Sequence, residues 1–313
     1  MRPTQQMKDD KTPERATLTV PPEILSKIRQ VEIRTKKAVS SLFSGEYHSA
    51  FKGKGMEFFE SRPYQPGDDA RSMDWIVTAR VGEPFVKTFR EERELTMMIL
   101  FDISASNSFG SRGDVFKSEA AAELCATLAF SALRNNDKAG IIMFTDGIEL
   151  YVPPRKGRFH ALRIIREFFF FAPSGKGTDI AGALDYLNRV MKKRAIVFLV
   201  SDFRGDGYEK ALKATSRKHD LIAVRLKDPM EEALPPAGIL AMEDAETGAT
   251  VVVNTHDRFL MEEYRRSVAV ENEERKNLFA SAGVDEIVIG ADAPGTEPLA
   301  VFFRGRKRIR RFG

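Results

Sequence analysis

Four short apolar runs alternate with stretches of helical periodicity, and this rhythm constrains the fold of the chain more than any other feature. The runs lie at residues 97–104, 139–144, 195–200 and 221–226. A strand that is apolar at every position is buried on both faces, and strands that alternate with helices pair in parallel. We therefore expect an α/β fold: a doubly wound, mostly parallel sheet with helices on both faces.

The segments between and after these runs complete the expected order of elements. Apolar residues at helical spacing predict covering helices over 114–134, 159–171, 179–193 and 208–218. Beyond the last apolar run, the sequence predicts a hairpin over 240–253, a long helix over 257–282, and two terminal strands over 286–289 and 299–303.

The region before the sheet has a different character. Residues 21–45 read as a helix that ends at Gly45, and short segments between Gly and Pro residues over 47–90 suggest hairpins, including one extended segment over 75–79. The expected organisation is a disordered arm (1–20), an N-terminal helix and β-hairpin extension (21–94), the sheet domain (95–230), a C-terminal hairpin, helix and strands packed on it (231–303) and a basic tail (304–313).

Composition excludes several classes of protein. Hydrophobic residues make up 42% of the 313 residues and charged residues 30%, as in soluble globular proteins. No apolar run approaches the roughly 18 residues that span a bilayer, and the first residues lack the apolar core of a signal peptide. We expect a cytoplasmic protein, with peripheral attachment to the inner face of the membrane as an alternative.

The charge is concentrated at one end. The chain carries 49 basic and 45 acidic residues, but six of the bases lie in the last ten residues, so the rest has 43 bases against 45 acids. A basic surface over the whole domain, as in proteins that wrap nucleic acid, is therefore not indicated. The tail reads as a solvated or acid-pairing segment, with weak contact to anionic lipid or nucleic acid as the alternative.

Oxygen-bearing side chains cluster where the predicted strands end. Asp102, Ser104 and Ser106 follow the first strand at alternate positions, Asp202 follows the third, and Thr178 lies in a glycine-containing loop that opens a helix. The carboxyl ends of parallel strands meet at one sheet edge, so these side chains can converge there. The alternative is that these acids and hydroxyls only cap local turns.

Hydroxyls and carboxylates favour a hard cation such as Mg²⁺ or Mn²⁺. The single cysteine, Cys125, and four widely separated histidines provide no zinc motif. Only two of the five residues carry charge, so we expect the ion to keep an exchangeable position that attracts an acidic residue of a partner protein.

The pattern Asp102-x-Ser104-x-Ser106, with Thr178 and Asp202 after it, resembles the metal-ion-dependent adhesion site of von Willebrand factor A domains. This resemblance covers roughly residues 95–230. It implies a von Willebrand factor A-like fold with these five residues as metal ligands.

A second motif lies upstream, between residues 62 and 80. It resembles the signature of the bacterial domain-of-unknown-function family number 58, which is usually encoded beside MoxR-type AAA+ ATPases. The residues that carry it are Arg62, Tyr64, Gly67, Asp68, Asp69, Arg71, Asp74, Trp75 and Arg80, and their role stays open. The resemblance implies a protein that works with such an ATPase in the maturation or remodelling of protein complexes.

Two functions remain in competition. The first is a noncatalytic, metal-dependent protein-interaction module, and the second is a metal-dependent hydrolase, phosphatase-like, that uses Asp102 and Asp202. A hydrolase also needs a base or second metal, for which Asp179 or Asp206 would have to come near. The sequence has no Asp-x-Asp pattern at Asp102. We therefore favour the interaction module.

Overall fold

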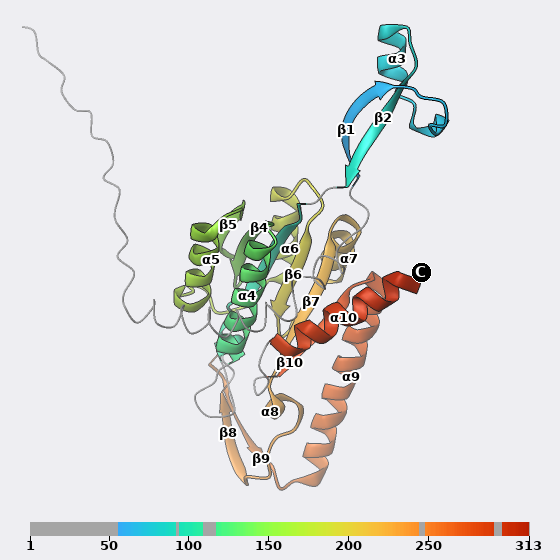
Figure 1. Cartoon of the computed structure of the whole chain (residues 1–313). Helices are drawn as coiled ribbons and strands as arrows, with labels where there is room; N and C mark the ends of the chain where they lie inside the picture. Colours follow the sequence, from blue (N-terminus) through green and yellow to red (C-terminus); the bar gives the residue numbers. More distant parts are fainter. Residues whose placement is uncertain (1–55, 92–93, 109–116, 244–247, 291–295, 313) are drawn as a thin grey trace, which may run out of the picture.

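A six-stranded sheet forms the centre of the molecule (Figure 1). The structure, a computed structural model, describes residues 56–91, 94–108, 117–243, 248–290 and 296–312. The strand order is β10-β7-β6-β3-β4-β5, in which five strands are parallel and β5 is antiparallel to β4. The strands are β3 (Thr96–Asp102), β4 (Lys138–Phe144), β5 (Ile148–Arg155), β6 (Ile196–Ser201), β7 (Asp220–Lys227) and β10 (Asp285–Gly290). The doubly wound fold expected from the sequence is confirmed.

Helices cover both faces of this sheet and bury two separate cores. On one face, α4 (Lys117–Arg134), α5 (Arg158–Phe170) and α10 (Thr296–Phe312) pack over a cluster that includes Phe101. On the other face, α6 (Ile180–Val190), α7 (Glu209–Lys218) and the end of α9 (Arg258–Ala282) cover a second cluster, which includes Leu199. The central strand β6 is buried at every position. This explains its uninterrupted apolar sequence.

Two extensions leave the sheet at opposite edges. The first, which we call the arm, consists of the antiparallel pair β1 (Met56–Pro63) and β2 (Phe85–Glu91) with the 3-10 turn Ala70–Ser72 and helix α3 (Trp75–Val81) between them. It joins the sheet at the first residue of β3, so it projects from the amino edge (Figure 1). At the carboxyl edge, β7 continues into α8 (Pro229–Glu232), the hairpin β8 (Ile239–Glu243) and β9 (Thr250–Asn254), and then α9.

Two sequence predictions need correction, and one strand was missed. Residues 299–303 are not a strand but part of α10, because Leu299, Phe302 and Phe303 recur at helical spacing and pack on the core beside α4. Residues 75–79 are not extended but helical, because Asp74 caps the first turn and Gly82 ends α3 at a φ of 82°. The strand β5 was not expected at all.

The basic tail is also part of α10, whose backbone continues helical to Phe312. The predicted helix over 21–45 and the disordered arm over 1–20 lie outside the described residues. Among the described residues, no helix combines the length and apolar character that crossing a bilayer requires.

Candidate functional site

The registers of β3 and β6 bring the two predicted aspartates to one place. Phe101 pairs with Val200, so the next residues on each strand, Asp102 and Ser201, lie side by side. The Ser201 hydroxyl donates a hydrogen bond of 2.6 Å to Asp102 Oδ2. Asp202 follows directly and is 5% exposed, while Asp102 is fully buried. Both carboxylates therefore lie at the carboxyl edge of the sheet, beneath the surface.

The loop after β3 folds back onto Asp102. The backbone N–H of Ser104 donates to Asp102 Oδ1 at 3.0 Å. The hydroxyls of Ser104 and Ser106 are 3.0 Å apart and point the same way, as their alternate positions predicted. This loop therefore gathers one carboxylate and two hydroxyls within hydrogen-bond reach of one another.

The loop that carries Thr178 is tied to the same edge by backbone hydrogen bonds. Ala105 N–H donates to the Lys176 carbonyl at 3.0 Å, and Asp179 N–H donates to the Thr145 carbonyl at 2.7 Å. Thr178 is half-buried between these two anchors. All five predicted site residues thus lie on three loops that meet at the carboxyl edge.

Two residues that the sequence analysis missed hold this last loop in place. The Glu149 carboxylate accepts hydrogen bonds from the Thr145 hydroxyl at 2.9 Å and from the backbone N–H groups of Ser174 at 3.0 Å and Gly175 at 2.7 Å. These hydrogen bonds lower the pKa of Glu149, and the bond from the Gly175 N–H has the largest effect. A Cβ on Gly175 would lie 2.3 Å from Thr145 Oγ1, so any other residue here would displace the Thr145 side chain. Thr145 directly follows β4, so the sequence signal used for Asp102 and Asp202, a polar residue at the end of an apolar strand, also identifies it.

The electrostatics of the two aspartates differ from those of ordinary surface acids. Burial, and then the neighbouring Asp202 carboxylate, raise the pKa of Asp102 to about 6, although hydrogen bonds from Ser201 and Ser104 oppose the shift. Asp202 Oδ1 accepts a hydrogen bond from the Arg204 N–H at 3.1 Å, but the buried Oδ2 has no hydrogen-bond partner among the described residues. Two close carboxylates, one with an unsatisfied buried oxygen, form an environment that a cation would stabilise.

No other metal-binding cluster competes with this site in the described part of the chain, where no group of three or more His, Cys, Asp or Glu side chains is arranged to hold an ion. The two alternative bases considered for a hydrolase lie on different loops, before α6 and after β6. The Asp179 carboxylate caps α6 by accepting from Gly182 N–H at 2.8 Å, while Asp206 is exposed at the rim of a cavity.

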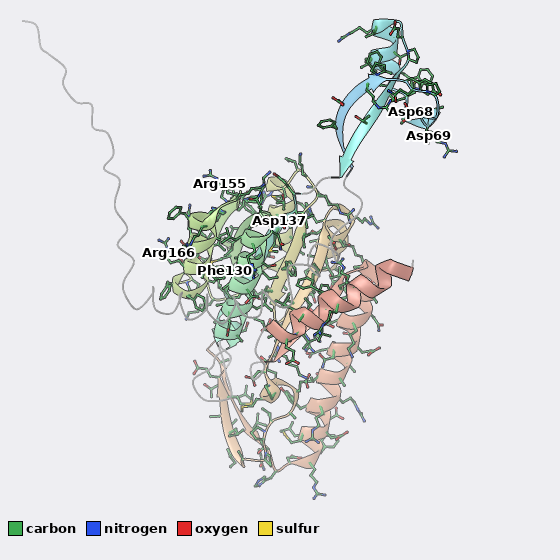
Figure 2. All side chains as sticks on the ribbon, viewed as in Figure 1. Asp68, Asp69, Phe130, Asp137, Arg155 and Arg166 are labelled. Carbon is green, nitrogen blue, oxygen red and sulfur yellow. The ribbon has the colours of Figure 1, made fainter. Side chains whose placement is uncertain are left out.

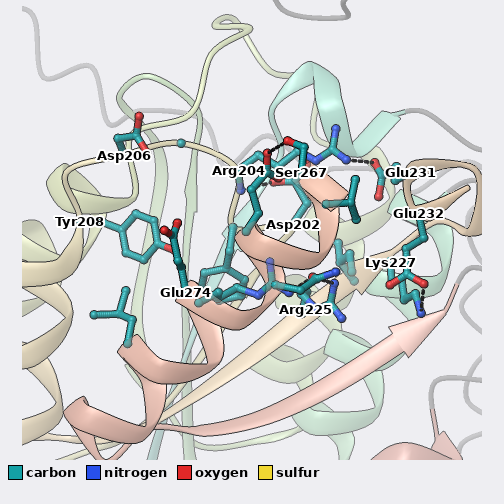
Figure 3. A pocket seen from close by; sticks show the side chains of 18 of the residues that line it. Asp202, Arg204, Asp206, Tyr208, Arg225, Lys227, Glu231, Glu232, Ser267 and Glu274 are labelled. Atoms are coloured by element: carbon teal, nitrogen blue, oxygen red, sulfur yellow. Dashed lines mark hydrogen bonds and ion pairs between the residues drawn. The ribbon is translucent and has the colours of Figure 1, made fainter. Parts of the chain in front are cut away.

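This cavity, of about 590 Å³, opens beside Asp202 between the loop after β6, the end of β7 and α9 (Figure 3). Arg204 pairs with Glu231 and Lys227 with Glu232 along its wall. The cavity therefore joins one candidate ligand of the site to solvent.

The upstream motif lies elsewhere. Its residues are in the arm, and Figure 2 shows Asp68 and Asp69 there, away from the sheet. Arg62 and Asp68 form a two-bonded ion pair at 2.8 and 2.7 Å, which raises the pKa of Arg62 and lowers that of Asp68. Gly67 has a φ of 107°, a conformation that favours glycine, in the turn between them.

Two more acids of the motif also have local structural partners. Asp69 accepts from the Arg71 backbone N–H at 2.9 Å and caps the 3-10 turn. Asp74 accepts from the Ser61 hydroxyl at 2.6 Å, which lowers its pKa, and from the first N–H groups of α3. In contrast, Tyr64, Arg71, Trp75 and Arg80 are exposed. The motif thus builds the arm and leaves part of its surface uncovered.

The chain is similar to several known proteins. An uncharacterized protein of Mycobacterium bovis, Mb1516, is 29% identical over 290 residues, which are 92% of this chain and 91% of that protein. The crystal structure of the conserved hypothetical protein BatB from Bacteroides thetaiotaomicron is similar over 68% of this chain and 99% of its own, with 15% identity and a TM-score of 0.44. The von Willebrand factor A domain of SpRpn10 is similar over 66% of this chain and 94% of its own, with 11% identity and a TM-score of 0.38.

The family comparison covers the arm, the sheet domain and most of α9 together. The model of the family described as "Protein of unknown function DUF58" matches residues 60–274, a span that includes both the arm motif and the carboxyl-edge loops. The chain belongs to the DUF58 family.

Proposed function

We propose that this protein is a noncatalytic, metal-ion-dependent protein-interaction module. In this proposal Asp102, Ser104, Ser106, Thr178 and Asp202 hold Mg²⁺ or Mn²⁺ at the carboxyl edge of the sheet, directly or through water. The oxygen-only donor set suits these hard cations. The bound ion would supply an electrophilic position for an oxygen ligand from another protein.

One observation carries the proposal: within the part of the chain that the structure describes, the buried Asp202 Oδ2 lies near a second buried carboxylate and has no hydrogen-bond partner. Buried acids are normally satisfied by donors, and a pair of acids without a cation between them is costly. A divalent ion removes both costs at once. The hydroxyls of Ser104 and Ser106, 3.0 Å apart, add neutral oxygens at the same place.

The partner's chemistry follows from the ion. With two charged ligands the ion retains positions that an outside carboxylate can take, so we infer an acidic residue of a protein ligand. The partner we propose is a MoxR-type AAA+ ATPase, or a protein that such an ATPase remodels. This step rests on membership of the DUF58 family and on the resemblance of its motif to ATPase-linked relatives.

Calorimetric titration of the full chain with Mg²⁺ and Mn²⁺ tests the metal site. Asp202→Asn keeps the size of the side chain but removes its charge, and we expect it to weaken ion binding by tenfold or more. Asp206→Asn is the matched control because it is exposed in the same loop, and it should bind as the wild type does. If the folded wild-type protein binds neither ion, the metal site is wrong.

Capture of the ATPase with and without EDTA tests the interaction. We expect capture that requires the divalent ion and fails with Asp202→Asn while circular dichroism stays unchanged. Metal-dependent turnover of a generic phosphate ester that Asp202→Asn abolishes would instead favour the hydrolase and overturn the noncatalytic proposal.

A further inference from the structure

We propose that the arm is a membrane-docking element: α3 inserts Trp75 and Ile76 into the interface of an anionic bilayer, while Arg71 and Arg80 contact the lipid headgroups. This inference does not depend on the metal site, which lies at the other edge of the sheet. It gives the exposed residues of the family motif a role.

The first step concerns which charged residues of the motif already have partners within the arm. Its acids Asp68, Asp69 and Asp74 are engaged in the ion pair and caps that shape the arm. By contrast, no ion pair joins the side chain of Arg71 or Arg80 to any carboxylate within the described ranges. The exposed charged groups of the motif are therefore the guanidinium groups of Arg71 and Arg80 and the carboxylate of Asp69, which already accepts the Arg71 N–H.

The second step is the apolar surface between these cations. Trp75 is 70% exposed and Ile76 is 76% exposed, on the first turn of α3. Ala79 and Arg80 follow one helical turn later and are exposed as well. The opposite side of α3 is held to β2, where the Thr78 hydroxyl accepts from the Phe85 N–H at 3.0 Å. Folding of the arm therefore fixes Trp75 and Ile76 outward.

A projecting tip of this composition suits the interface of a bilayer. Tryptophan prefers the headgroup level, isoleucine gains from burial among acyl chains, and arginine is attracted to anionic lipid. The helix α3 that carries these residues lies at the far end of the arm from the sheet (Figure 1). Its exposed apolar side chains would be costly in water unless something covers them.

A basic element lies at the same edge of the sheet. Arg306 of α10 pairs with Asp220 and Asp285, which are the first residues of β7 and β10. These two ion pairs hold the basic end of α10 at the amino edge of the sheet, from which the arm also projects. The sequence after Arg306 adds Lys307, Arg308, Arg310 and Arg311. Buried apolar area and attraction to anionic lipid both strengthen peripheral attachment, and the arm and the end of α10 offer one feature each.

The hairpin at the opposite edge provides the contrast. It also exposes apolar residues, among them Ile239 at 75%, but its two strands contain one acid, Glu243, and no base. Anionic lipid would not be attracted there. Ile239 therefore matches Ile76 in residue type and exposure while differing in electrostatic surroundings.

Vesicle binding by the full chain tests the proposal. Trp75 is the only tryptophan, so its fluorescence reports the environment of the tip directly. With vesicles of phosphatidylethanolamine and phosphatidylglycerol we expect a blue shift of its emission and co-sedimentation, both weakened by salt and at least tenfold weaker with phosphatidylcholine alone. Ile76→Asp, and separately Arg71→Glu with Arg80→Glu, should each reduce co-sedimentation about tenfold or more, whereas Ile239→Asp should not.

Each other outcome overturns the inference. Absence of binding to the anionic vesicles contradicts it outright. Binding that is unaffected by Ile76→Asp, or lost equally with Ile239→Asp, shows that the tip is not the contact. A blue shift that appears with increasing protein concentration in the absence of vesicles assigns the tip to a second copy of the chain instead.

Discussion

Asp102 occupies a position that is unfavourable for a charged group in the metal-free protein. Its carboxylate is fully buried beside Asp202, and its pKa is raised to about 6. The folded protein therefore holds a proton on Asp102 more tightly than the unfolded chain does. The resulting stabilisation is present at low pH and is lost as the pH rises through about 6. At neutral pH the ionised side chain destabilises the fold, which is typical of a residue retained for binding.

Asp102→Asn should consequently stabilise the metal-free protein. We expect a gain of roughly 1 to 3 kcal/mol in the free energy of unfolding at pH 8 in EDTA, and a smaller gain at pH 5. Burial lowers the pKa of His219 to about 4, so the contribution of this residue to the stability of the protein is lost as the pH falls from 6.5. This loss is the same in the wild type and the variant, so it cancels in the difference between them. Urea denaturation measures the difference.

The control for this variant is Asp179→Asn at the same edge. Asparagine caps a helix as well as aspartate does, so the stability should stay unchanged. If Asp102→Asn is less stable than the wild type at pH 8, the hydrogen bonds from Ser201 and Ser104 outweigh the cost of burying the charge.

At the level of elements, the strand and helix order was predictable because buried parallel strands are apolar throughout. The elements that escaped are those whose local sequence is ambiguous. β5 contains Pro153 and Pro154, which argue against a strand in the middle of a sheet but are tolerated at the edge, where β5 lies. The apolar run at 299–303 is too short for periodicity to separate strand from helix.

The candidate site also contains residues that could be predicted from the sequence and residues that could not. Its five predicted residues follow strands that the sequence identifies, so their convergence could be expected. The brace formed by Glu149 could not, since it depends on the antiparallel turn of β5 back onto β4 and on hydrogen bonds to Ser174 and Gly175.

The correction at α10 leads to a prediction about its arginines. Arg306 is largely buried, pairs with Asp220 and Asp285, and lies over the Phe302 ring, whereas Arg304 is exposed. Arg306→Ala leaves Asp220 without its cation, so we expect a loss of about 2 kcal/mol or more in stability to urea. Arg304→Ala should cost less than about 0.5 kcal/mol. Equal losses would mean that the ion pairs do not anchor α10.

At the scale of the whole molecule, the sheet separates two edges with different chemistry. The carboxyl edge carries Asp102, Asp202 and the cavity, and the amino edge carries the arm and the basic end of α10 (Figure 1). If both proposals hold, the protein attaches to a bilayer by one edge and offers the opposite edge to a protein partner. The buried strands β3 and β6 separate the two edges, and coupling between distant sites requires an element with two discrete arrangements.

We therefore expect the two edges to act independently. Asp202→Asn should leave vesicle affinity within about twofold of wild type, because sites without shared contacts contribute additively. Mg²⁺ screens anionic lipid itself, so it should weaken vesicle binding to the same degree in both proteins. Conversely, reversing the charges of Lys307, Arg308, Arg310 and Arg311, while sparing the structural Arg306, should weaken vesicle binding and preserve Mg²⁺-dependent capture of the ATPase. Loss of that capture in a protein with unchanged circular dichroism would place the basic end of α10 in the partner interface and show that the edges are coupled.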